Sequence, residues 1–148
     1  MQGAITATTE TLGGSCHCGA IRYVLHWPGS ATTIEARACG CSFCCKHAGT
    51  WCSHPKARLE IPAANRDSTV RYRFGTGTAD FCLCSRCGVA PFVLSEIDAR
   101  TYAVVNVNTL ANLSAISIRQ TKTDFAGEDT NSRLERRQRN WIPDVYIC

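Results

Sequence analysis

Hydrophobic and polar residues alternate over short stretches along much of the chain, as in β-strands that bury one face. Over residues 69–74, three large hydrophobic residues alternate with a threonine and two arginines. Short stretches rich in β-branched and aromatic residues also cover 20–27, 33–38, 79–83 and 101–107. Glycine- and proline-containing turns separate several of them. The pattern predicts a mainly β fold in which 69–74 and 79–83 form a hairpin.

Helical patterns occupy two short segments. Residues 42–48 are predicted to form a single helical turn that ends at Gly49. Residues 131–140 have strong helical composition, and Leu134 and Trp141, seven residues apart, fall on one face. The chain is therefore expected to end in a short C-terminal helix.

The length of 148 residues is that of one ordinary domain. We expect this domain to span residues 12–143, between flexible termini at 1–11 and 144–148. No apolar run approaches the roughly 18 residues of a membrane span, so no membrane association is expected. Residues 1–11 lack the basic start and apolar stretch of a secretory signal, which predicts a cytoplasmic protein.

The composition is unusual in its eleven cysteines. In a secreted protein they would form a disulfide framework, whereas in a reducing cytosol they would be metal ligands or reactive thiols. Their number is odd, most lie in tight clusters, and no export signal precedes them. These observations favour metal binding.

The cysteine spacing divides the clustered thiols into a set of four and a set of three. A closed structural zinc site takes four ligands, usually two from each of two short turns. Two cysteine pairs, each followed by a glycine that allows a tight turn, meet this requirement: Cys16, Cys18, Cys84 and Cys87. The middle cluster supplies three thiolates within six residues: Cys39, Cys41 and Cys44. Three ligands leave one position of a tetrahedral zinc open, as in catalytic sites, so the sequence predicts two zinc ions per chain, one structural and one catalytic.

The fourth ligand of the second zinc stays open at this point. A water molecule would keep the site catalytic. Two cysteines and two histidines are near enough in sequence to be the fourth ligand: Cys45, Cys52, His47 and His54. A fourth thiolate would close the site and make it structural, whereas either histidine could instead be a proton-transfer group.

The formal charge of +4 does not predict nucleic-acid binding. It falls to +1 when seven thiolates bind two Zn²⁺ ions. The main basic run has Glu135 interleaved and is interpreted as a solvated helix face rather than a phosphate-binding patch: Arg133, Arg136, Arg137 and Arg139.

Three segments resemble the motifs of one known family, in the family's order. Residues 14–23 (GSCHCGAIRY) resemble the opening motif of the glutathione-dependent formaldehyde-activating enzyme family, which is grouped with centromere protein V. Residues 39–49 and 74–88 resemble its second and third motifs, and 133–143 are similar to the end of many short bacterial members. The resemblance implies packed, twisted β-sheets, as in small zinc-binding Rab exchange chaperones. It also implies a structural zinc on the outer motifs and a catalytic zinc on the middle one.

Three thiolates and one Zn²⁺ carry a net charge of −1, which makes a weak Lewis acid that is better suited to binding a soft thiol and lowering its pKa. The resemblance implies a reaction of this kind, in which glutathione and formaldehyde form S-hydroxymethylglutathione. We therefore expect a zinc-dependent carbon–sulfur lyase or synthase whose partners are a small thiol and an aldehyde. Lys46 is expected either to meet a glutathione carboxylate or to be an exposed lysine.

Two other functions remain open. One is a non-catalytic zinc module that binds a protein partner, which is favoured if a fourth protein ligand closes the second site. The other is a redox sensor that uses the remaining thiols: Cys45, Cys52, Cys82 and Cys148.

Overall fold

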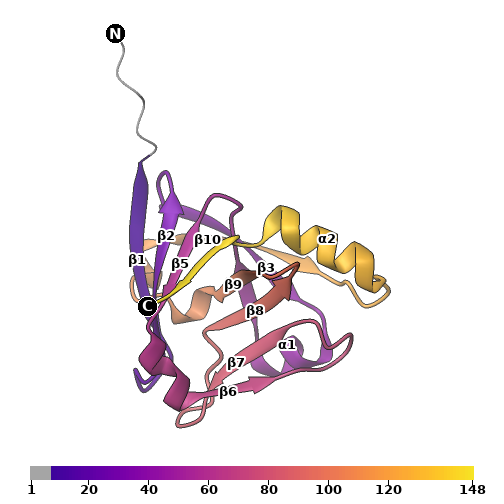
Figure 1. The fold of residues 1–148 in the computed structure, drawn as a ribbon. Coiled ribbons are helices and arrows are strands. Elements are labelled where there is room, and N and C mark those ends of the chain that lie inside the picture. Colours follow the sequence, from indigo (N-terminus) through magenta and orange to yellow (C-terminus); the bar gives the residue numbers. More distant parts are fainter. Residues whose placement is uncertain (1–7) are drawn as a thin grey trace.

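The computed structural model describes residues 8–148, and its strands form two sheets (Figure 1). The four-stranded sheet, on the left in Figure 1, has the order β1 (Thr9–Ser15), β2 (Arg22–Pro28), β5 (Arg58–Ile61) and β11 (Asp144–Ile147). The seven-stranded sheet has the order β10 (Ser117–Thr123), β3 (Thr33–Cys39), β4 (Thr50–Cys52), β9 (Arg100–Asn106), β8 (Phe92–Ile97), β7 (Asp80–Cys84) and β6 (Thr69–Tyr72). The predicted mainly β fold of packed sheets is confirmed.

Two α-helices accompany the sheets: α1 (Ser42–His47) and α2 (Thr130–Asn140). The Asp129 side chain caps α2 by accepting a hydrogen bond from the Ser132 amide at 2.8 Å. Helix α1 ends one residue earlier than expected, because Ala48 rather than Gly49 takes the left-handed conformation (φ 54°) at its C-cap. Three 3₁₀-helical turns cover η1 (Ala63–Ser68), η2 (Val107–Thr109) and η3 (Leu113–Ala115). The short C-terminal helix is confirmed.

The central strands of the seven-stranded sheet, β8 and β9, are buried on both faces. Alternate residues of β8 point in opposite directions, so Phe92 and Leu94 join the core between the two sheets, whereas Val93 joins a second core on the other face. Strand β9 repeats the pattern, with Val105 in the first core and Val104 in the second. The second core also contains Leu134 and Trp141, the two residues expected on one face of the C-terminal helix. The helix therefore covers the sheet face that lies away from the four-stranded sheet.

Strand β6 departs from the expected burial pattern. Val70 and Tyr72, predicted to face a core, are 51% and 47% exposed. The reason is its position at the edge of the seven-stranded sheet, where it pairs with β7 on one side only. The predicted hairpin with β7 is confirmed.

The strands extend beyond the expected limits of the domain at both ends. Strand β1 begins at Thr9 and pairs with β2, and β11 lies in the segment expected to be a flexible C-terminus. Strand β11 is paired in parallel with β5, and this pairing depends on a segment more than eighty residues away in sequence. Residues 1–7 of the expected flexible N-terminus lie outside the described residues.

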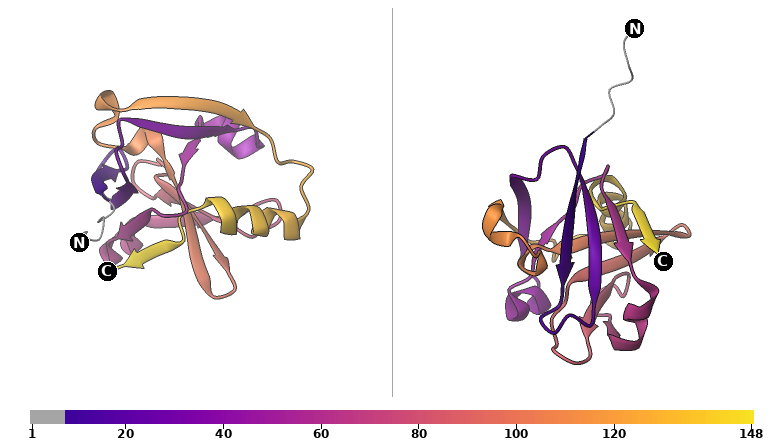
Figure 2. Two further views of the ribbon diagram at one scale, coloured as in Figure 1. Left: turned by 90° about the horizontal axis from the view of Figure 1, so that it is seen from above. Right: turned by 90° about the vertical axis from the view of Figure 1, so that its left-hand side faces the viewer.

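The connection from β10 to α2 carries the chain across one side of the molecule (Figure 2). Strand β10 lies parallel to β3, and the left view shows the chain descending from the end of β10 to the start of α2. Because β3 leads into α1, this arrangement brings residues 124–129 and α2 to the side on which the middle cysteine cluster lies. Over residues 8–148, we find no helix with the length and apolar character that crossing a membrane requires.

Candidate metal sites and pocket

The four outer cysteines converge at the junction of the two sheets. Cys16 and Cys18 lie in the turn between β1 and β2, whereas Cys84 ends β7 and Cys87 lies in the turn that follows. Their four Sγ atoms lie within 4.8 Å of one another, with Cys18 Sγ 3.6 Å from Cys84 Sγ. Four thiols at this spacing can hold one tetrahedral zinc ion. Such an ion would tie the four-stranded sheet to the seven-stranded sheet.

The two turns that carry these cysteines have the same local geometry. Gly19 and Gly88, each directly after its second cysteine, have φ values of +83° and +81°, a region that side chains other than glycine rarely adopt. The Ile21 amide donates to Cys16 Sγ at 3.3 Å, and two amides of the second turn donate to Cys84 Sγ at 3.3 and 3.4 Å. Amide donors of this kind stabilise thiolates, which are the form that binds metal.

The middle cluster forms at the start of α1. Cys39 ends β3, Cys41 is the N-cap of α1 and Cys44 lies in its first turn, and their three Sγ atoms lie within 4.8 Å of one another. The Cys41 side chain accepts a hydrogen bond from the Cys44 amide at 3.4 Å. The indole Nε1 of Trp51 donates to Cys44 Sγ at 3.3 Å and so fixes its position. This donor set of three soft sulfur atoms fits zinc.

Contacts within the cluster favour a thiolate at one position. The hydrogen bond from Cys44 lowers the pKa of Cys39 to about 5, and the Cys41 amide and the charge of Arg136 act in the same direction. The same contact with Cys39, together with burial, raises the pKa of Cys44. The cluster therefore holds at least one negative charge near neutral pH, which attracts a cation.

Two cysteines considered as a fourth ligand stay outside the group of three Sγ atoms. Cys52 on β4 is fully buried in the core between the sheets, and burial raises its pKa to about 12. Cys45 is exposed on α1. Neither residue belongs to a cluster of potential metal ligands within the described part of the chain.

The two candidate histidines also lie outside the group of three thiols. The ring of His47 stacks on Phe43, with centroids 4.3 Å apart. His54 packs edge-on against Trp27, and its Nδ1 accepts a hydrogen bond from the Lys56 amide at 3.0 Å. Among residues 8–148, the middle cluster thus has three protein ligands, which is the number expected of an open site.

A cavity of about 340 Å³ borders the three thiols. The sheet supplies its floor through Val93 and Val104, and Trp51 and Trp141 stand at its sides. Four further segments complete its lining. They are Arg37 on β3; Phe74, Gly75, Thr76, Ala79 and Phe81 around the β6–β7 turn; Thr123 at the end of β10, with Phe125, Ala126 and Glu128 after it; and Arg133, Arg136 and Arg137 on α2. The cavity is apolar near the sheet and cationic along the helix.

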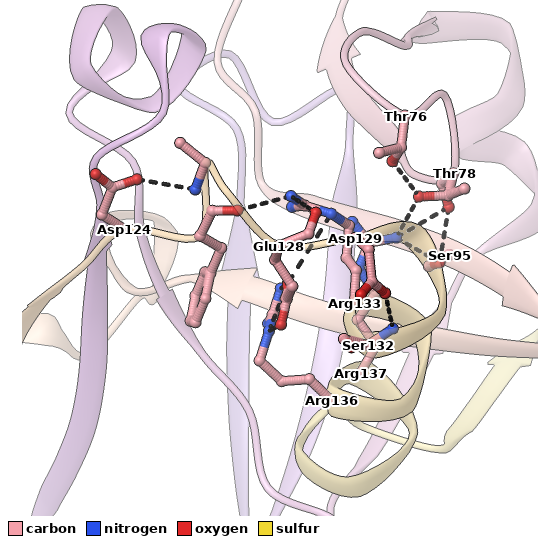
Figure 3. Close-up of polar contacts among 12 residues, drawn as sticks. Thr76, Thr78, Ser95, Asp124, Glu128, Asp129, Ser132, Arg133, Arg136 and Arg137 are labelled. Carbon is pink, nitrogen blue, oxygen red and sulfur yellow. Dashed lines mark hydrogen bonds and ion pairs between the residues drawn. The ribbon is translucent and has the colours of Figure 1, made fainter.

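The interpretation of the basic run as a solvated helix face is wrong for three of its four members. Arg133, Arg136 and Arg137 line the cavity, and Arg137 is only 7% exposed, whereas Arg139 is exposed as expected. Figure 3 shows the three guanidinium groups turned toward the segment that precedes α2 and toward the β6–β7 turn. Partners outside the helix offset the cost of burying them: the segment just before α2 for Arg133 and Arg136, and the residues that lie 42 and 59 positions earlier for Arg137. The pattern of charges within the helix does not reveal such partners.

Glu128 is the acidic group among these arginines (Figure 3). The Nε and Nη2 atoms of Arg136 donate to both of its carboxylate oxygens at 3.0–3.2 Å, and this pairing lowers the pKa of Glu128. Arg133 Nη2 donates to the Phe125 carbonyl at 2.8 Å, and the guanidinium carbon of Arg136 lies 3.6 Å from the centroid of the Phe125 ring. These contacts hold residues 125–128 against the helix as one wall of the cavity.

The remaining predicted residues lie apart from the cavity. Lys46 is exposed on α1 and does not line it, so a contact with glutathione stays a prediction. Cys82 is fully buried, and burial raises its pKa to about 12; Cys148 is exposed. From the sequence, the four arginines of the cavity and Glu128 were not predicted to belong to the site.

The chain is similar to a known protein family and to a protein of solved structure. The model of the glutathione-dependent formaldehyde-activating enzyme family matches residues 11–126. A protein from Rhodobacter sphaeroides of known crystal structure is 24% identical, with a TM-score of 0.49 over 72% of this chain and 99% of that one. The matched family region holds all seven clustered cysteines and stops short of α2.

Proposed function

Because the chain belongs to the glutathione-dependent formaldehyde-activating enzyme family, we propose that it is a zinc-dependent carbon–sulfur lyase or synthase that acts on thiol–aldehyde adducts. Glutathione and formaldehyde are the thiol and aldehyde that the family name indicates. The abundance of free thiols suits a reducing compartment, so we place the activity in the cytoplasm.

The observation that carries the proposal is the position of the cavity. It is lined by all three cysteines of the middle cluster and by none of the outer four. A metal site that opens onto a cavity can meet a substrate, whereas a closed four-cysteine site stabilises the fold. We therefore assign the catalytic zinc to Cys39, Cys41 and Cys44, and the structural zinc to the outer cluster.

Zinc bound at the middle cluster would supply an acceptor for a soft thiol and lower the pKa of that thiol. In the proposed reaction the thiol sulfur adds to the carbonyl carbon, and one carbon–sulfur bond forms. The carbonyl π electrons move to the oxygen, which takes the proton released by the thiol. No group leaves and no atom is oxidised or reduced, so the reverse step is a simple lyase reaction.

The protein side chains prepare the cavity for this addition. Trp51 fixes Cys44 through its indole N–H, which limits movement of the ligand set. Val93, Val104 and Trp141 are buried and give the cavity an apolar lining that disfavours water. A low-water site favours addition of the thiol over hydration of the aldehyde.

The test is the rate of S-hydroxymethylglutathione formation, followed by exchange NMR with ¹³C-formaldehyde and glutathione. The zinc-loaded protein is expected to raise this rate in proportion to its concentration. Removing zinc with a chelator should abolish the acceleration, and adding zinc back should restore it. A rate that does not respond to the protein at any concentration contradicts the proposal and favours a zinc module that binds a protein partner.

A further inference from the structure

Arg137 is a buried cation without a carboxylate partner. Its side chain is 7% exposed, and no Asp or Glu oxygen lies within ion-pair distance of it among residues 8–148. Burial lowers its pKa to about 10, which leaves the guanidinium charged near neutral pH. Burying an unpaired charge is costly, so a compensating anion in the cavity would stabilise it.

The hydrogen bonds of Arg137 leave part of its guanidinium group free. Nη1 donates to Thr78 Oγ1 at 2.8 Å, to the Thr78 carbonyl at 3.2 Å and to Ser95 Oγ at 3.1 Å (Figure 3). Nε is buried and has no hydrogen-bond partner among the described residues. Nη2 also makes no hydrogen bond to these residues, but it is not fully buried. The Trp141 ring, 5.0 Å from the guanidinium carbon, limits its movement. The group is thus held in place by one nitrogen while another stays available in the cavity lining.

The other cationic groups of the cavity are already engaged. Glu128 accepts hydrogen bonds from Nε and Nη2 of Arg136, and its Oε1 atom lies 3.9 Å from Arg133 Nε. Arg37 donates to Ser53 Oγ at 2.8 Å and belongs to β3, the strand that ends at Cys39. One carboxylate therefore faces four guanidinium groups in the lining, and Arg137 is the most deeply buried of the four.

We propose that Arg137 is a specificity-determining residue that binds a carboxylate of the substrate in the cavity that the three thiols also line. The inference rests on the proposed function and narrows its substrate class to thiol–aldehyde pairs in which one partner bears a carboxylate. The carboxylate can belong to the thiol, as in glutathione, or to the aldehyde, as in a 2-oxo acid such as glyoxylate. Helix α2, which carries Arg137, lies beyond residues 11–126, the region that the family model matches.

The test uses four substrate pairs with the zinc-loaded protein: glutathione or 2-mercaptoethanol, each with formaldehyde or glyoxylate. Arg137→Gln removes the charge but keeps an amide donor for Thr78 and Ser95, and Arg137→Lys keeps the charge. Losing a charge-assisted hydrogen bond should raise KM about 10- to 100-fold for the pairs that contain the carboxylate recognised by Arg137. The change for 2-mercaptoethanol with formaldehyde should be at least about tenfold smaller, and the Lys variant should recover part of the loss. Arg139→Gln, an exposed change two residues away on α2, is the matched control and should behave as wild type.

Binding measured by calorimetry gives a readout that does not depend on turnover. If the thiol carries the recognised carboxylate, Arg137→Gln should weaken binding of glutathione by the same factor as KM, and glutathione diethyl ester should lose little. If the aldehyde carries the recognised carboxylate, the increase in KM should appear for 2-mercaptoethanol with glyoxylate instead. Either pattern supports the subsite. If Arg137→Gln weakens all four pairs equally, or none of them, the carboxylate subsite is overturned, whereas the proposed carbon–sulfur lyase activity still stands. A wild-type protein that accelerates none of the four pairs contradicts the proposed function instead.

Discussion

Cys84→Ser is expected to give a chain that is insoluble or loosely folded. Cys84 Sγ lies 3.6 Å from Cys18 Sγ, 66 residues away in sequence, and the two belong to turns of different sheets. A zinc ion held there closes a long loop and joins the sheets, so its binding energy is largely folding energy. Structural sites of this type contribute about 10–16 kcal/mol in small zinc-finger peptides, which compares with the whole stability of a domain, about 5–15 kcal/mol.

The measurement is the soluble yield, followed by circular dichroism and thermal unfolding. Cys82→Ala is the matched control, because Cys82 lies on the same strand, is fully buried and stands outside the cluster. It should cost roughly 1 kcal/mol and leave a folded protein. A Cys84→Ser protein that folds as well as this control would contradict the structural role of the outer cluster.

Cys41→Ser is expected to abolish turnover and leave the fold intact. Cys41 is the N-cap of α1, and serine is a good N-cap residue, so the hydrogen bond from the Cys44 amide is kept. The three ligands close only a local loop, and their loss costs little folding energy. Removing one thiolate should nevertheless lower turnover of thiol–aldehyde adducts by at least about 100-fold, since even changes around the ligands of a metal site cost 10- to 100-fold.

Cys45→Ser is the control for this variant, because Cys45 lies on the same helix, is exposed and stands outside the cluster. It should retain wild-type turnover. If Cys41→Ser unfolds while Cys84→Ser folds and is merely inactive, the structural and catalytic assignments are reversed. If Cys41→Ser keeps full turnover, the middle cluster is not the reaction site.

Cysteine spacing predicted the turns that supply both thiol clusters, because the geometry of each turn is local. The pairs at 16–18 and 84–87 and the triplet at 39–44 each form within one turn, and the glycine after each pair marks the turn itself. The strands predicted at 20–27 and 101–107 from their β-branched and aromatic residues match β2 and β9 to within two residues. Short-range patterns of this kind are visible in a single sequence.

The burial of Arg137 in the cavity wall could not be predicted, since its partners lie far away in sequence. Arg137 contacts Thr78 and Ser95, which lie 59 and 42 residues before it. An arginine on a helix is ordinarily read as exposed, and only these distant contacts show that it is buried. The parallel pairings of β10 with β3 and of β11 with β5 were missed for the same reason, because a parallel neighbour leaves no local turn signal.

The central claim, that this chain holds two zinc ions of different kinds, is tested most directly by metal content combined with thiol counting. The wild-type protein, purified under reducing conditions, is expected to contain two zinc ions and Cys41→Ser one. Two thiols of the native wild type should react quickly, Cys45 and Cys148, because they are exposed and outside both clusters, whereas Cys52 and Cys82 are fully buried and should react only on unfolding. A wild-type protein with a single zinc, or with several disulfides after anaerobic purification, would contradict the account.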